Sequence, residues 1–323
     1  MSRLFVKGLK VPSIGVSGFT RSGKAMLMKL LSTYEMIDKP NEDIFFEQIY
    51  FLHKIKKIND QTANYLIKKN FNILYYYNLI GRNINFKKGD WSSALNYHNS
   101  KIYKKRLNSS DLNKNLINKN KIIYQMMLHT GLNSGKLLLN SLPSLKIIEM
   151  VKNPIEIAYS WINKNYGKDI YDKPTIYAPT CKFKNNIVPY YASGWEEEYL
   201  KMSEFDRVIK MTTNLFLDRE KEIKKLNVSE KRRVMLVFFD KLVTEPQSEL
   251  KRISKFIKRD FTNNTLKLLK VEKIPRIVFS DEYFKKIKFL KKKSTPKIFN
   301  KLVTCEKKYL KNLNSFNNLN LIK

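Results

Sequence analysis

The chain has 323 residues, enough for one large α/β domain or two small ones, and no apolar run approaches the ~18 residues of a membrane span. Its formal net charge is +33, from 62 Lys+Arg against 29 Asp+Glu; anionic partners are plausible, but the lysines are spread along the whole chain, which argues against a nucleic-acid-binding surface. The N-terminus carries no basic-then-apolar signal segment, so we expect a soluble, cytoplasmic protein.

The first predicted element is a strand over residues 14–16, followed by a glycine-punctuated loop and an apolar-periodic helix that includes residues 26–31. The loop reads Gly18-Phe-Thr-Arg-Ser-Gly23-Lys24. Its two glycines free the backbone to bend so that successive N–H groups point inward, and the helix adds its positive N-terminal end. Such a loop indicates an anion-binding site, although a plain tight turn fits the same two glycines.

The same loop satisfies the pattern G-x-x-x-x-G-K of nucleotide-binding P-loops. The next position should supply a hydroxyl that binds Mg²⁺, but Ala25 stands there. An ATP- or GTP-dependent enzyme would therefore lack one metal ligand.

The segment that follows predicts a turn at residues 38–42 and then helices. Apolar side chains recur at helical spacing over residues 44–52, and residues 64–79 predict a second, apolar-rich helix.

Charged and polar loops complete the stretch 41–120, which we expect to be a helical and loop insertion. Residues 81–90 predict a surface loop, in which Arg82, or Arg106 further on, could also meet a polar or anionic acceptor. The Asn- and Lys-rich residues 108–120 predict a loop or a short exposed helix.

Three further apolar segments predict buried strands, over residues 121–128, 144–151 and 234–239. His129 directly follows the first of them. Because ligands of open α/β sheets gather at the carboxyl ends of strands, His129 is a candidate for catalysis, with a structural role as the alternative.

A firmly specified helix follows the second of these strands. Asn153 suits the N-cap, Pro154 suits the first helical position, and Glu156 can complete a capping box. Ser160 lies about two turns further along the same face, so that Lys152 and Ser160 could hold one anionic group between them. The alternative is an ordinary strand-to-helix joint with a surface lysine.

The later segments predict a loop or lid over residues 166–194, a charged amphipathic helix over residues 203–225, and a helix that begins with Thr244 as its N-cap. Residues 260–323 predict helices that close over the sheet.

Two features bear on metal binding. Asp240 follows an apolar run and resembles the Mg²⁺-binding Asp of P-loop NTPases, which favours the alternative of a nucleotide phosphotransferase. Cys181 and Cys305 are far apart and have no His cluster beside them, so we expect no zinc site; a disulfide stays open.

Three segments, in this order, resemble the sulfotransferase family that uses 3′-phosphoadenosine 5′-phosphosulfate (PAPS). Gly18–Gly23 is similar to the family's 5′-phosphosulfate loop, residues 151–160 resemble its 3′-phosphate motif, and residues 239–246 are similar to its later Tyr-Glu-Asp-Leu…Pro segment. The resemblance implies a single domain over residues 1–323 with a P-loop-type α/β fold, a three-layer sandwich whose central, mostly parallel sheet is flanked by helices.

The resemblance also implies roles for individual residues. Arg21 matches the catalytic basic residue that steadies the sulfuryl group and the leaving phosphate, and Lys152 and Ser160 match the 3′-phosphate pair. The spacing of His129 from Lys152 matches the family's catalytic His, but many carbohydrate-acting members use a Glu, so the base stays open. The cofactor-binding set that we expect is Thr20, Arg21, Ser22, Gly23, Lys24, Ala25, Lys152, Ser160 and Phe239.

The chain departs from the family pattern at four positions. Lys24 and Ala25 stand where the family has Thr and then Ser or Thr, Thr20 replaces Pro, and Lys152 replaces Arg. Lysine at 152 keeps the positive charge but lacks the arginine guanidinium, which can bind a phosphate with two parallel N–H donors. Lys24 could compensate by reaching the phosphosulfate directly.

The resulting hypothesis is a sulfotransferase that uses PAPS as donor, releases PAP, needs no metal, and acts on a hydroxyl. The expected acceptor is a carbohydrate, with a lipid, a small alcohol or a protein tyrosine as alternatives. We expect the insertion over residues 41–120 to shape the acceptor site. The rival functions are a P-loop phosphotransferase or NTPase and a non-enzymatic polyanion-binding protein.

Overall fold

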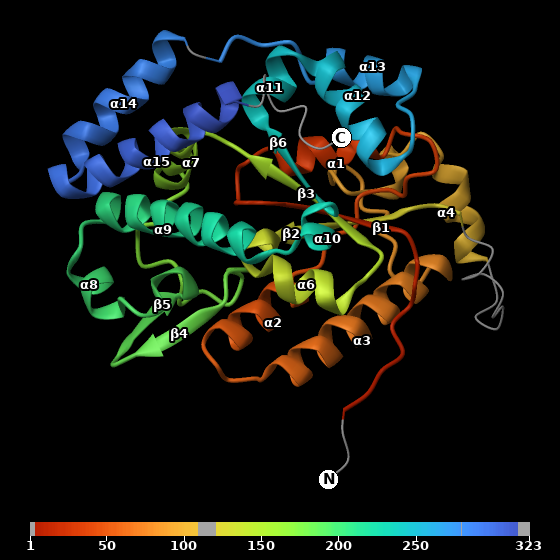
Figure 1. The fold of residues 1–323 in the computed structure, drawn as a ribbon, viewed down its shortest axis with the longest axis horizontal. Helices are drawn as coiled ribbons and strands as arrows, with labels where there is room; N and C mark the ends of the chain where they lie inside the picture. Colours follow the sequence, from red (N-terminus) through yellow and green to blue (C-terminus); the bar gives the residue numbers. More distant parts are fainter. Residues whose placement is uncertain (1–3, 109–120, 279, 316–323) are drawn as a thin grey trace.

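The computed structural model describes residues 4–108, 121–278 and 280–315, and its centre is a four-stranded parallel sheet (Figure 1). The strands lie in the order β2-β1-β3-β6. Their bounds are β1 Ser13–Gly18, β2 Tyr124–His129, β3 Leu145–Val151 and β6 Val234–Phe238. All four predicted strands are therefore confirmed, and the predicted α/β fold with a central parallel sheet is correct.

The strand register brings the ends of the strands to one edge. Gly18 at the end of β1 pairs with His129 at the end of β2, and Val151 at the end of β3 pairs with Phe238 at the end of β6. Because all pairs are parallel, the loops that leave these ends share one side of the molecule.

Helices from both halves of the chain cover one face of the sheet. Alternating apolar residues of the strands, such as Val16 of β1 and Ile148 of β3, pack against these helices in one core. The helices are α1 Lys24–Leu31, α11 Phe239–Thr244, α12 Pro246–Ile257 and α13 Asn263–Val271.

The opposite face is covered by two neighbouring groups of helices (Figure 1). One group packs around Trp161 and the other around β2, where Tyr124, Met126 and Leu128 point toward it. The first group is α7 Pro154–Ile162, α9 Glu204–Lys225, α14 Asp281–Lys293 and α15 Pro296–Ser315. The second is α2 Phe45–Lys54, α3 Asp60–Leu79 and α6 Gly135–Ser141.

Short elements connect these layers. Helical turns and short helices are η1 Ala94–Asn96, α4 Ser100–Leu107, η2 Gly131–Ser134, η3 Tyr190–Ala192, α8 Glu196–Lys201 and α10 Val228–Lys231. An antiparallel hairpin is made of β4 Thr180–Phe183 and β5 Asn186–Pro189.

Two predictions need correction. Residues 166–194 are not simply a loop, because they contain the β4–β5 hairpin, whose residues are mostly exposed or half-buried and give no clear strand signal. Thr244 does not cap a helix: its hydroxyl donates to the carbonyl of Asp240 inside α11, and α12 begins at Pro246, which suits a first helical turn. The predicted polar stretch at 108–120 lies almost wholly outside the described residues.

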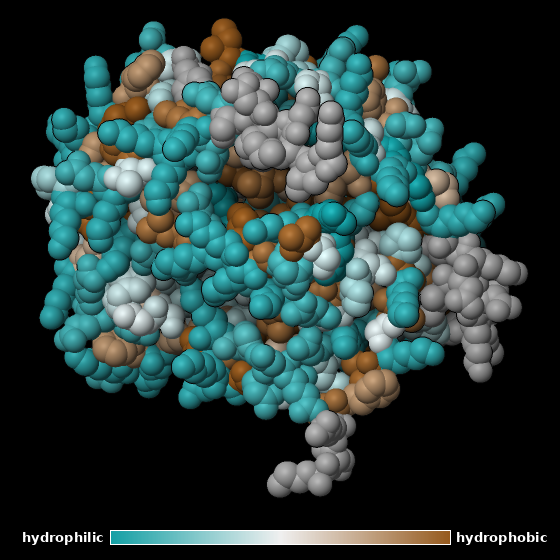
Figure 2. Space-filling model, in the orientation of Figure 1, coloured by the Kyte–Doolittle hydropathy of each residue, from teal (hydrophilic) through white to brown (hydrophobic). Residues whose placement is uncertain are grey.

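The surface is mostly hydrophilic in the view of Figure 2, as the lysine-rich composition leads one to expect. Within the described ranges, no helix combines the length and the apolar character that a bilayer crossing requires.

A buried ion pair joins the middle of the sheet to α9. Oε1 of Glu149 lies 3.6 Å from Nη1 of Arg219, and the exposed fractions of the two side chains are 0% and 4%. Burial raises the pKa of Glu149, while the guanidinium of Arg219 opposes that rise. Removing either partner therefore leaves a buried charge without its closest counter-ion.

We expect Arg219→Met to lower the free energy of unfolding by about 3–5 kcal/mol, because the buried Glu149 carboxylate loses its ion-pair partner. The double variant Arg219→Met, Glu149→Met should recover most of this loss, since apolar replacement of a buried pair is often neutral. Urea unfolding at pH 7 measures both. A single-variant loss below about 1 kcal/mol would show that Lys24, the other nearby cation, suffices for Glu149.

Candidate active site

The loop between β1 and α1 has a backbone built to turn its N–H groups inward. Gly18, Arg21 and Gly23 have φ angles of +149°, +71° and +97°. The N–H of Ser22 donates to the carbonyl of Phe19 at 3.0 Å and closes the turn. The Ser22 hydroxyl is buried and has no hydrogen-bond partner among the described residues. Leaving such a group unpaired costs about 1–3 kcal/mol, so this hydroxyl fits a ligand that carries oxygen acceptors.

Helix α7 contacts this loop at two points. Nε of Arg21 donates to Oγ of Ser160 at 3.2 Å, and Nε1 of the fully buried Trp161 donates to the carbonyl of Thr20 at 2.8 Å. The two predicted anion-binding corners, 139 residues apart in the chain, therefore lie side by side.

The start of α7 is set by the residues that the sequence indicates. Oδ1 of Asn153 accepts from the N–H of Ile155 at 2.8 Å, and Pro154 occupies the first turn. Glu156 does not complete the predicted capping box, because its carboxylate accepts instead from Nζ of Lys286 in α14 at 2.9 Å.

Lys152 and Phe239 bring the ends of β3 and β6 up to the loop. Nζ of Lys152 lies 4.4 Å from the ring centroid of Phe239, and burial lowers the pKa of this lysine. A Cβ on Gly23 would lie 2.7 Å from the same ring, so that the ring requires glycine there. No Lys152 ion pair is found in the described part of the chain, which leaves its ammonium able to take an anion.

Lys24 lies underneath the loop. Its ammonium is buried and donates to the carbonyl of Gly18 at 3.0 Å. Burial lowers its pKa to about 8, although the carboxylates of Glu47, Glu149 and Glu42 oppose that effect. Lys24 therefore adds positive charge behind the loop, in an environment of low dielectric.

His129 faces a carboxylate that the sequence analysis missed. Its Nε2 lies 3.5 Å from Oε1 of Glu42, with exposed side-chain fractions of 17% and 38%. Burial, and then the charge of Lys24, lower the pKa of His129 to about 4, so the imidazole is neutral at pH 7. Glu42 sits in the predicted turn at 38–42, and it reaches the site because that turn crosses back to pair with Met127 of β2. No local sequence signal marks that crossing.

A buried hydrogen-bonded chain links α2 to the hairpin segment. The Tyr190 hydroxyl donates to Oε1 of Glu47 at 2.8 Å and lies 3.0 Å from the hydroxyl of Thr130. Burial raises the pKa of Glu47 to about 7, although Tyr190 and Lys24 oppose the rise. This chain holds the segment after β5 against the end of β2.

The carboxylate of Asp240 is bonded by a tyrosine of α15. Its Oδ2 accepts from the Tyr309 hydroxyl of α15 at 2.8 Å, and burial raises its pKa to about 6. Over the described ranges, no three His, Cys, Asp or Glu side chains lie close enough to hold a metal ion together. Cys181 and Cys305 are both free thiols.

A family model described as "Sulfotransferase domain" matches residues 12–312, and the chain belongs to this family. A search of curated proteins gives no match.

Three solved sulfotransferase structures are similar to the chain at low identity. The sulfotransferase domain from the Synechococcus PCC 7002 olefin synthase is 10% identical, with coverage of 96% of this chain and 98% of that chain and a TM-score of 0.43. The sulfotransferase from Alicyclobacillus acidocaldarius is 11% identical, with coverage of 92% and 96% and a TM-score of 0.41. The sulfotransferase domain from the curacin biosynthetic pathway is 11% identical, with coverage of 80% and 78% and a TM-score of 0.41.

Because the pKa of Glu47 is raised in the folded state, we expect its contribution to stability to be lost as pH rises from about 4.5 to about 7. In that interval the folded state keeps a proton that the unfolded chain has released. The unfolding free energy of Glu47→Gln minus that of wild type should therefore increase by roughly 3 kcal/mol from pH 4.5 to pH 7.5. Urea unfolding at both pH values measures this gain, and parallel pH profiles for the two proteins would contradict the raised pKa.

Proposed function

We propose that the protein is a PAPS-dependent sulfotransferase that transfers a sulfuryl group from PAPS to a hydroxyl of a carbohydrate acceptor and releases PAP. The observation that carries this proposal is the 3.2 Å hydrogen bond from Arg21 to Ser160. The family resemblance assigns these residues to opposite ends of one nucleotide, and a donor can span both corners only if they lie together.

The donor fits the unpaired groups of the two corners. Ser22 offers a buried hydroxyl, and the loop N–H groups and the start of α1 favour the 5′-phosphosulfate. Lys152 offers a cation for the 3′-phosphate, and among the described residues no carboxylate lies within ion-pair distance of it. Ser160 offers a hydroxyl for the same group. Thr20, Gly23, Ala25 and Phe239 would complete the donor site. When bound, the donor supplies an activated sulfuryl group on a phosphate leaving group.

Positioned charge would provide most of the catalysis. An in-line displacement spreads negative charge onto the sulfuryl oxygens and the leaving phosphate, where preorganised cations and N–H groups stabilise it. Arg21 would contact these oxygens after it releases Ser160. Lys24, buried behind the loop, adds to the same positive field, and it could reach the phosphosulfate if it exchanged its bond to Gly18.

The geometry favours Glu42 over His129 as the group that takes the acceptor's proton. Glu42 is partly exposed and lines a cavity, whereas His129 is mostly buried and does not line it. A neutral His129 that carries its proton on Nε2 can donate toward Glu42 and orient it. His129 would then be a positioning residue.

We expect adenosine 3′,5′-bisphosphate to raise the melting temperature without Mg²⁺. Lys152→Ala should weaken its binding by about ten- to a hundredfold, because a charged hydrogen bond contributes about 1.5–3 kcal/mol. Lys146→Ala is the matched control, since Lys146 lies at the other end of β3 and bonds the carbonyl of Phe256. Titrations followed by thermal shift and calorimetry measure both.

Two other results would replace the proposal. A thermal shift with Mg·ATP but none with the bisphosphate would favour a P-loop phosphotransferase. Salt-sensitive binding to heparin or DNA that persists in Arg21→Ala, without any bisphosphate binding, would favour a polyanion-binding protein.

Glu42→Gln should lower kcat about a hundredfold or more and leave bisphosphate affinity unchanged, because it removes the proton acceptor but no donor contact. His129→Asn should cost less, and it should mainly change the pH profile. Transfer of label from ³⁵S-PAPS, measured from pH 5 to 9, separates the two roles. A larger loss in His129→Asn than in Glu42→Gln would assign the base to His129.

A further inference from the structure

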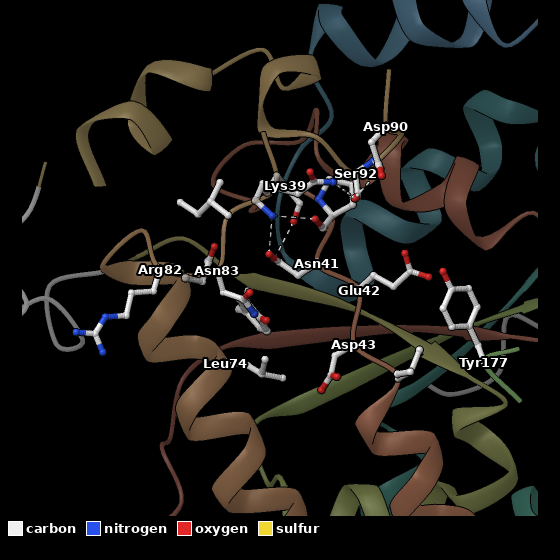
Figure 3. A pocket seen from close by; sticks show the side chains of 16 residues that line it. Lys39, Asn41, Glu42, Asp43, Leu74, Arg82, Asn83, Asp90, Ser92 and Tyr177 are labelled. Atoms are coloured by element: carbon white, nitrogen blue, oxygen red, sulfur yellow. Dashed lines mark hydrogen bonds between the residues drawn. The ribbon is translucent and has the colours of Figure 1, made fainter. Parts of the chain in front are cut away.

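A polar cavity of about 470 Å³ opens beside Glu42 (Figure 3). It is lined by residues 39–44, by the end of α3 with the loop that follows, and by Tyr177 from the segment before β4. Its volume falls in the range of about 300–1,000 Å³ typical of small-molecule sites. Since Glu42 is the proposed base and lines this cavity, an acceptor bound here would have a hydroxyl within reach of the Glu42 carboxylate.

The cavity wall is acidic in a strongly cationic protein. Glu42, Asp43 and Asp90 line it, and none of the three lies within ion-pair distance of a Lys or Arg in the described part of the chain. The whole chain has 62 Lys+Arg against 29 Asp+Glu. Three neighbouring carboxylates without a Lys or Arg ion pair are therefore unexpected in this protein.

Neutral groups hold two of these carboxylates in place. Asp43 accepts from the Asn70 amide at 2.7 Å and from the N–H of Phe45 at 3.0 Å. Asp90 accepts from the N–H and the hydroxyl of Ser92, both at 2.9 Å, and these bonds lower its pKa. Hydrogen bonds of this kind stabilise the ionised form without neutralising its charge. Lys87 adds only a smaller electrostatic effect on Asp90.

The two cations of the wall do not cancel this charge inside the cavity. Lys39 is buried, and its Nζ donates to the carbonyl of Pro40 and to Oδ1 of Asn41. The Arg82 guanidinium lies 5.6 Å from the Tyr77 ring, and Figure 3 shows it directed away from Asn41 and from the carboxylates.

The remaining wall suits hydroxyl groups. Oδ1 of Asn78, a residue that is 98% buried and lines the cavity, has no hydrogen-bond partner within the described ranges. Asn83 adds an exposed amide to the wall, and Tyr177 presents an aromatic ring beside Glu42. Amides that both donate and accept, together with a ring, match the edges and the faces of a sugar.

We propose that this cavity binds the acceptor, and that Asp43 and Asp90 restrict it to neutral or amine-bearing sugars and reject acidic ones. The inference rests on the proposed sulfotransferase function, because that function makes Glu42 the neighbour of the reacting hydroxyl. Like charges repel one another even across a partly exposed wall, so an acidic sugar should bind here more weakly than a neutral one.

The test compares three sugars of the same ring and different charge: glucose, glucosamine and glucuronate. Each is titrated against the full-length protein saturated with adenosine 3′,5′-bisphosphate, and saturation-transfer NMR gives the dissociation constants. We expect glucuronate to bind at least about tenfold more weakly than glucose, and glucosamine at least as tightly as glucose.

Two substitutions then test the mechanism of selection. Asp43→Asn and Asp90→Asn keep the side-chain shape and remove one charge each, so the preference for glucosamine over glucuronate should fall about three- to tenfold in each variant. Glu35→Gln is the matched control, because it changes an exposed carboxylate in the turns after α1, outside the cavity, and should leave the preference unchanged.

Each outcome is decisive. The inference is wrong if glucose and glucuronate bind equally, or if none of the three sugars binds. In either case, binding of the bisphosphate would still support the proposed function. A preference that drops equally in Glu35→Gln would assign the effect to overall charge and also overturn it. Failure of the bisphosphate to bind contradicts the proposed function separately.

Discussion

The site depends on the parallel pairing of β1 with β3. This pairing sets the loop after β1 and the helix after β3 at one edge of the sheet. Trp161 then donates to Thr20, and Arg21 donates to Ser160, so that α7 fixes the position of the loop. A slip of this register by one residue would turn every side chain of β3 to the other face and separate the two corners.

A few buried charged groups affect the site more strongly than the many lysines on the surface. The surface carries a large excess of lysine, which contributes little specific interaction in water. Beneath the loop, Lys24 lies with Glu47 and Glu149 in an environment of low dielectric, where each charge influences the others strongly. The site is therefore set by a few buried groups whose pKa values differ from the ordinary ones, as is typical of functional sites.

The departures from the sulfotransferase family pattern have structural counterparts. Lys24, in place of Thr, occupies the space behind the loop and bonds the carbonyl of Gly18. Lys152, in place of Arg, lies over the ring of Phe239, so the aromatic face restrains a side chain that lacks the guanidinium fork. These substitutions change how the site is supported while its two corners stay together.

The sequence by itself determined the elements of the site that are local. The strand–loop–helix around Gly18 and Gly23, the Asn153 cap and the strand that ends at His129 all follow from periodicity, capping and turn chemistry within about ten residues. Only the tertiary structure decided which groups face one another. Glu42 reaches His129 because its turn pairs with β2, and Asp240 turns to Tyr309 because α15 packs beside α11. Such contacts join residues far apart in the chain, and their energy comes from packing and burial that no local pattern records.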